Sequence, residues 1–135
     1  MVKIPEISRV NLVEILRFIG LEDLRWSILY LWATSKQGSA IDIIDLEKRT
    51  KDRFGYQLDW DSLLALANEL EQVIECTLVG VNHANSLPDR TLSLDELKKR
   101  CHVVIEAVDS TSWEVYVKDE ALSRGLMEAF GGTQI

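Results

Sequence analysis

Cysteine is scarce in this sequence, which has only Cys76 and Cys101 among its 135 residues. Two thiols fit a reducing cytoplasm better than the disulfide framework of a small secreted domain. The first residues, MVKIPEISR, also lack the long apolar stretch of a secretory signal. We therefore expect a cytoplasmic protein that is not exported by that route.

Long apolar runs and catalytic motifs are also missing. No run approaches the roughly 18 apolar residues of a membrane span, so we expect no membrane association. The sequence contains no GxSxG, GxGxxG or HExxH motif and no P-loop, although common nucleophile, nucleotide and zinc sites carry such signatures. We therefore expect no cofactor, and an enzyme is the least favoured functional class.

Histidine is as rare as cysteine, with only His83 and His102. These two residues and the two cysteines could in principle bind zinc, but the CxxC and HxxxH spacings of zinc sites are absent. Cys101 and His102 are adjacent, so they would point apart in an extended chain. We expect no metal site, and we interpret Cys76 as a buried, inert thiol rather than the nucleophile of a Cys–His pair.

Clusters of positive charge are few, and the formal net charge of the chain is −7. Residues 40–75 hold nine acidic against four basic residues, a net −5. Lysines and arginines gather only at 48–53 and 98–100, beside acids in helical patterns, which is typical of solvated faces. A helix expected over 59–72 presents acids where a DNA-reading helix presents Arg, Asn or Gln. We therefore expect a basic protein partner and no nucleic acid.

Hydrophobic residues make up 47% of the chain and include four tryptophans, enough for a sizeable core. We expect residues 1–135 to form a single globular α+β domain. The apolar spacing is helical before residue 75 and strand-like after it. This change predicts about four N-terminal helices followed by a small β-α-β-β-α unit, with a three-stranded sheet packed on the helices. One core cluster is expected to contain Trp32, Leu66, Leu70 and Trp113.

The helical half divides at glycines and capping residues. Helices are predicted over 9–19 with Gly20 as the stop, over 22–36 as a buried central helix, over 41–54, and over 59–72. Ser39 and Asp42 resemble a capping arrangement for the third helix, although its β-branched start also allows a strand. Asp59 or Asp61 is expected to cap the fourth.

The later half begins with a predicted strand over 75–82, followed by a loop rich in turn residues. Ser93 and Glu96 form a capping box for a short helix, and the path to residue 103 is long enough for a crossover connection. A hairpin follows over 103–118, and Asp119 is expected to cap a last helix that glycines terminate at 131 and 132.

The hairpin register follows from the apolar pattern. A two-residue turn at Ser110 and Thr111 would place Glu106 among apolar residues, and burying an unpaired carboxylate costs several kcal/mol. An odd loop over 109–111 instead gives one face that is wholly apolar. That face holds Val103, Ile105, Ala107, Trp113, Val115 and Val117. We favour the odd loop, although it lacks the glycine that a left-handed loop position prefers.

The odd loop places Glu106 and Glu114 opposite each other on the outer face, an arrangement that costs stability. With Tyr116 they would form an acidic-aromatic patch. Either this patch docks a cationic group of a partner, or Lys118 or a nearby arginine neutralises it as an ordinary surface cluster.

Three functional classes are consistent with these features. The favoured class is a non-enzymatic binding protein with an acidic surface, such as an inhibitor or an immunity protein that neutralises a nuclease toxin. The second is a structural or self-associating accessory domain, and the sequence allows a homodimer. The third is an enzyme whose site includes Glu106, Glu114, Tyr116 and His102. The candidate partner-binding residues are Asp42, Asp45, Asp59, Asp61, Glu69, Glu71, Glu106, Glu114 and Tyr116.

Overall fold

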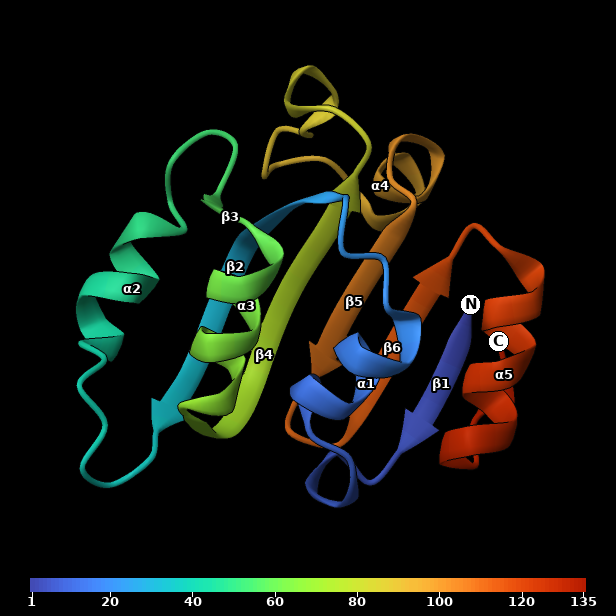
Figure 1. The fold of residues 1–135 in the computed structure, drawn as a ribbon, viewed down its shortest axis with the longest axis horizontal. Helices are drawn as coiled ribbons and strands as arrows, with labels where there is room; N and C mark the ends of the chain where they lie inside the picture. The colour runs from blue at the N-terminus through green and yellow to red at the C-terminus, as the bar shows by residue number, and fades with distance from the viewer.

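Seven antiparallel strands form one sheet in the order β3-β2-β4-β5-β6-β1-β7 in a computed structural model that describes residues 1–135 (Figure 1). The strands are β1 Val2–Pro5, β2 Arg25–Ser35, β3 Tyr56–Leu58, β4 Leu70–Val81, β5 Val103–Val108, β6 Ser112–Val117 and β7 Thr133–Gln134. The helices are α1 Leu12–Ile19, α2 Ile43–Arg49, α3 Trp60–Asn68, α4 Leu94–Arg100 and α5 Glu120–Phe130, with short 3₁₀ turns at Ile7–Arg9 and Ala84–Ser86. None of the five helices is long and apolar enough to cross a membrane.

The α+β class is confirmed, but the predicted arrangement of four N-terminal helices before a three-stranded sheet is wrong. The chain begins with a strand, and four of the seven strands start before residue 75. The crossover is also wrong, because β4 and β5 are antiparallel neighbours. The segment that contains α4 is therefore a long connection between two adjacent strands.

The buried helix predicted over 22–36 is the strand β2. Leu31 and Ala33 are buried, whereas Tyr30 and Trp32 are 43% and 51% exposed, as alternation across a sheet requires. A register shift after Ile28, where Leu29 is the extra residue of β2, interrupts that alternation, and residues 26–29 are all buried. A bulge moves the side chains that follow it to the other face of the sheet. The apolar residues of this strand therefore do not keep a period of two along the sequence, and the segment resembles a buried helix.

The helix predicted over 59–72 is only partly correct. Asp59 caps α3 by accepting a hydrogen bond from the Ser62 backbone, but α3 ends at Asn68 and Leu70 begins β4. The predicted core cluster is corrected at Trp32, which lies outside it on the exposed side of the sheet. Its other members are placed as expected, since Leu70 and Trp113 are buried in the main core and Leu66 packs against it.

Several local predictions are confirmed. Gly20 ends α1 in the left-handed conformation, with φ of +64°. The third segment is helical rather than extended, but α2 covers only Ile43–Arg49 and its N-cap is Asp42 rather than Ser39. Ser93 with Glu96 forms the capping box of α4 as predicted. Asp119 caps α5 and Gly131 terminates it.

The helices cover the two faces of the sheet unequally. Figure 1 shows α1 and α3 in front of the sheet, with α2 beyond β2 and α5 beyond β1. Buried residues of these four helices join the main core, whereas α4 contributes Leu97 to a separate cluster with Leu29, Val79 and Val104 on the opposite face. That second cluster covers only part of its face, and the remainder of that face is solvent-accessible at Tyr30 and Trp32.

Candidate functional site

The uncovered part of the sheet carries an ordered row of polar and aromatic side chains. Tyr30 pairs with Thr77, Thr77 with Glu106, and Glu106 with Glu114, each across neighbouring strands. Paired residues in a sheet project to the same side. Lys3 on β1 continues this row opposite Glu114, and Trp32 with Glu75 begins the next row. We call this surface the open face, made of Lys3, Tyr30, Trp32, Glu75, Thr77, Glu106 and Glu114.

The hairpin places the two central carboxylates as the sequence predicts. The loop contains three residues, because Val108 pairs with Ser112, and Glu106 therefore lies opposite Glu114. The loop turns without glycine, since Asp109 and Ser110 both adopt positive φ, at +48° and +59°. The odd register is confirmed.

Neither of the two glutamates forms an ion pair. The three ion pairs of the structure lie elsewhere and join Arg9 to Glu6, Arg49 to Asp45, and Arg53 to Asp89. Burial raises the pKa of Glu106, and the nearby charge of Glu114 raises it further. The Thr77 hydroxyl donates a hydrogen bond of 3.3 Å to Glu106 Oε2, which lowers that pKa only in part. Glu106 is therefore a half-buried carboxylate whose charge the fold does not compensate.

A second acidic pair borders the same surface. A side-chain hydrogen bond with Asp109 is the main cause that raises the pKa of Glu75, followed by burial and by the Asp109 charge. A hollow of about 270 Å³ lies between the hairpin loop and β2, and Tyr30, Glu75, Asp109 and Glu106 are among its lining residues. Its charged lining residues are all acidic, so the local field favours a cation.

Tyr116 differs from the two glutamates because its ring already contacts a cationic side chain of the protein. The Lys98 ammonium lies 5.9 Å from the centre of the Tyr116 ring, within the range of a cation–π contact. Tyr116 also packs against the cluster beneath α4. Lys3 faces Glu114 in register but forms no ion pair with it. The predicted acidic-aromatic patch therefore has its aromatic component in Tyr30 and Trp32 as well as in Tyr116.

Three acids of segment 40–75 stabilise helices locally. Asp42 and Asp59 cap α2 and α3 through backbone hydrogen bonds. Asp45 pairs with Arg49 at 2.8 Å within α2. The hydrogen bond from Ser62 lowers the pKa of Asp59, as expected for a capping carboxylate.

The other three candidate partner-binding acids of that segment lie apart. Asp61 is in the first turn of α3, Glu69 is its C-cap, and Glu71 follows on β4. Nine helical residues span about 13 Å at 1.5 Å per residue. The structure therefore brings Glu106 and Glu114 together, whereas it spreads the six candidate acids of segment 40–75 over α2, both ends of α3 and the beginning of β4.

The cysteines and histidines do not converge on one site. Cys76 is buried in the main core and Cys101 in the second cluster. Burial raises the pKa of the Cys76 thiol to about 12 and that of Cys101 to about 11, so both are protonated at neutral pH. Burial, then the charge of Lys118, lowers the pKa of His102, and His83 lies in the exposed loop after β4. No group of three or more His, Cys, Asp and Glu side chains is arranged to hold a metal ion.

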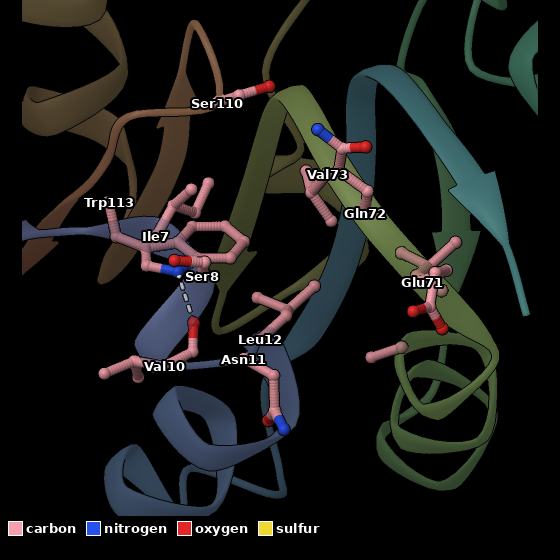
Figure 2. A pocket seen from close by; sticks show the side chains of 12 residues that line it. Ile7, Ser8, Val10, Asn11, Leu12, Glu71, Gln72, Val73, Ser110 and Trp113 are labelled. Atoms are coloured by element: carbon pink, nitrogen blue, oxygen red, sulfur yellow. Dashed lines mark hydrogen bonds between the residues drawn. The ribbon is translucent and has the colours of Figure 1, made fainter.

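A separate groove of about 340 Å³ lies beside the beginning of β4. Figure 2 shows Trp113 and Ile7 on one side of this groove and Gln72 and Val73, from β4, on the other. The indole Nε1 of Trp113 donates a hydrogen bond of 2.8 Å to the Val10 carbonyl, drawn as the dashed line. This bond fixes the largest wall of the groove.

Sequence reasoning missed five residues of the open face. Lys3 falls in no predicted element, Tyr30 and Trp32 fall in the segment predicted as a helix, and Glu75 and Thr77 were not connected with the glutamates of the hairpin. The local pattern does not place Tyr30 and Trp32, because their side chains are apolar like those of their buried neighbours Leu31 and Ala33.

Comparisons with protein-family models, with curated proteins and with solved structures gave no match for this chain. The geometry of the open face and of the groove is therefore the basis for a functional proposal.

Proposed function

We propose that this chain is a non-enzymatic binding domain that recognises a basic protein partner through the open face. The observation that supports the proposal is the half-buried pair of Glu106 and Glu114, which lie opposite each other and form no ion pair. Like charges in this position destabilise a sheet. A positively charged side chain from a partner would relieve the repulsion and form charge-assisted hydrogen bonds.

The surroundings of this pair favour arginine as the partner group. Tyr30 and Trp32 are large, exposed aromatic side chains on the same surface, 43% and 51% exposed. A guanidinium binds a carboxylate in a bidentate way and stacks on aromatic rings, whereas an ammonium acts as a strongly hydrated point charge. Aromatic residues that remain exposed on a free protein are also common energetic centres of protein interfaces.

The net charge supports the same class of partner. A charge of −7 attracts a basic protein over a distance and raises its association rate at low salt. Within this class we favour an inhibitor of a basic enzyme, such as an immunity protein that neutralises a nuclease toxin. Such an inhibitor needs a surface complementary to its basic target rather than catalytic residues. The acidic and aromatic side chains of the open face would provide such a surface.

The experiment that tests this proposal is a titration of the ¹⁵N-labelled protein with a short arginine- and glycine-containing peptide. We expect amide shifts on β2, β4, β5 and β6 around the open face. The double variant Glu106→Gln with Glu114→Gln should weaken binding by about 1 kcal/mol or more, the scale of a charge-assisted hydrogen bond. Its thermal melt should show unchanged or slightly higher stability, because the like-charge repulsion is removed.

The matched control is Asp61→Asn with Glu69→Gln, which removes the same charge from the two ends of α3. We expect this variant to bind the peptide almost as the parent protein does. If it loses as much affinity as the open-face variant, only net charge matters and the proposal is wrong. Strong destabilisation by the open-face variant would also contradict it, since Glu106 would then support the fold.

A further inference from the structure

The strand β4 has a free edge at its beginning. It contains twelve residues, but β5 pairs only with the part from Cys76 to Gly80. The backbone N–H of Ser110, in the hairpin loop, donates a hydrogen bond of 2.9 Å to the Ile74 carbonyl and closes the edge at that point. Before that point Leu70, Gln72 and Val73 pair with β2 alone, and Glu71 is the extra residue of a bulge. Its other side therefore carries backbone groups that no neighbouring strand satisfies.

This free edge borders the groove of about 340 Å³ beside β4. Figure 2 shows the side chains of Val73, Gln72 and Glu71 along the strand, with the hairpin and the segment before α1 across the groove. Seven of the twelve lining residues are hydrophobic, and the buried indole of Trp113 forms part of the opposite wall. The groove thus combines an unpaired strand edge with an apolar wall.

The groove carries charge of one sign only, which is negative. Glu71 is the single ionisable residue among the twelve that line it. Glu71 forms no ion pair, because the three pairs of the structure involve other residues. The polar remainder consists of Ser8, Asn11, Gln72 and Ser110. An occupant therefore meets hydrogen-bonding groups and one negative charge.

We propose that this groove binds an extended segment of a partner protein, which adds to β4 as a strand. Main-chain hydrogen bonds to an exposed strand edge supply affinity in this mode of recognition, and alternate side chains supply specificity. An added strand lies about 4.8 Å from its neighbour. It places an apolar side chain toward Ile7 and Val73, the two hydrophobic lining residues that are not buried, and a lysine or arginine toward Glu71.

A second copy of this chain fits the groove less well than a separate segment does. The two edge strands of the sheet, β3 and β7, contain only three and two residues. Short edge strands are a common protection against pairing between copies of a protein. The free edge of comparable length on a second copy is its own β4, and pairing two of these edges would bring the two Glu71 carboxylates near each other.

The probe for this proposal is a capped pentapeptide of alternating lysine and valine, titrated into the ¹⁵N-labelled full chain. We expect amide shifts and slowed hydrogen exchange at Glu71, Gln72 and Val73. Two N-methylated versions of the peptide, each modified at one set of alternate amides, distinguish main-chain from side-chain binding. One set should reduce the affinity at least about tenfold and the other should leave it nearly unchanged, because only alternate amides face β4.

Charge reversal at Glu71 tests the second element of the proposal. Glu71→Lys should weaken binding of the lysine peptide at least about fivefold and favour a glutamate–valine peptide, since the sign of the local charge is inverted. Glu128→Lys, an equal change at an exposed position of α5, should alter neither affinity.

Three outcomes would overturn the proposal. The first is an absence of shifts at Leu70 to Val73 at millimolar peptide, and the second is equal loss of affinity with both methylated peptides. The third is a concentration-dependent shift at these amides without peptide, which would assign the groove to a second copy. The Glu106→Gln, Glu114→Gln variant should bind this peptide normally, so the groove and the open face can fail separately.

Discussion

Replacement of Trp113 by alanine is expected to lower the free energy of unfolding by about 3–5 kcal/mol, the usual cost of deleting a buried aromatic side chain. Trp113 is 1% exposed in the main core, on the face of the sheet that the helices cover. The variant leaves a large cavity and removes the hydrogen-bond donor of the Val10 carbonyl. Urea unfolding of the variant and the parent protein measures this difference.

Trp32→Ala is the matched control, because it deletes the same side chain from the opposite face of the sheet. Trp32 is 51% exposed, so we expect a loss below about 1 kcal/mol, in the range of surface substitutions that leave the core intact. Equal losses from the two variants would show that the faces of β2 are assigned wrongly. A small loss from Trp113→Ala would contradict its place in the core.

Gly55→Ala is expected to cost about 2–5 kcal/mol of stability, for two additive reasons. Gly55 has φ of +73°, a left-handed conformation that a side chain disfavours. A Cβ atom at this position would lie 2.5 Å from both the Ile28 carbonyl oxygen and the Ser27 hydroxyl oxygen. Because the Ile28 oxygen belongs to the backbone of β2, the strand itself would have to shift.

Gly38→Ala separates these two causes. Gly38 has a similar φ of +80°, but a Cβ atom there would meet no other atom within 4 Å. Only the conformational cost of about 1–2 kcal/mol should therefore appear. The difference between the two variants in urea unfolding measures the close approach of Gly55 to β2. Equal losses would mean that this approach is absent.

Elements whose signals are local could be predicted from the sequence. The capping box at Ser93 with Glu96 acts within one helical turn. The hairpin register followed from the cost of burying Glu106, which depends only on the residues of two adjacent strands. The central part of the candidate site was predictable for the same reason.

The rest of the sheet depends on pairings between distant residues. Trp32 pairs with Glu75, and Lys3 pairs with both Glu114 and Thr133, across gaps that no local pattern spans. The bulge at Leu29 also interrupts the alternation of β2. The edge strands β3 and β7 are too short to show a period at all. The open face could therefore be recognised only once the sheet was known.

The most direct measurement of the proposed function is the pKa of Glu106, followed by NMR in the free protein and in the presence of the arginine-containing peptide. In the free protein, burial should hold this pKa above the ordinary value of 4.5. A guanidinium bound at Glu106 and Glu114 stabilises the ionised form, so the pKa should fall on saturation and a proton should be released. By linkage, the affinity should then rise as the pH increases through the pKa of Glu106 in the free protein. A pKa that stays the same on binding, with an affinity independent of pH in this range, would show that the peptide does not bind at the uncompensated carboxylates.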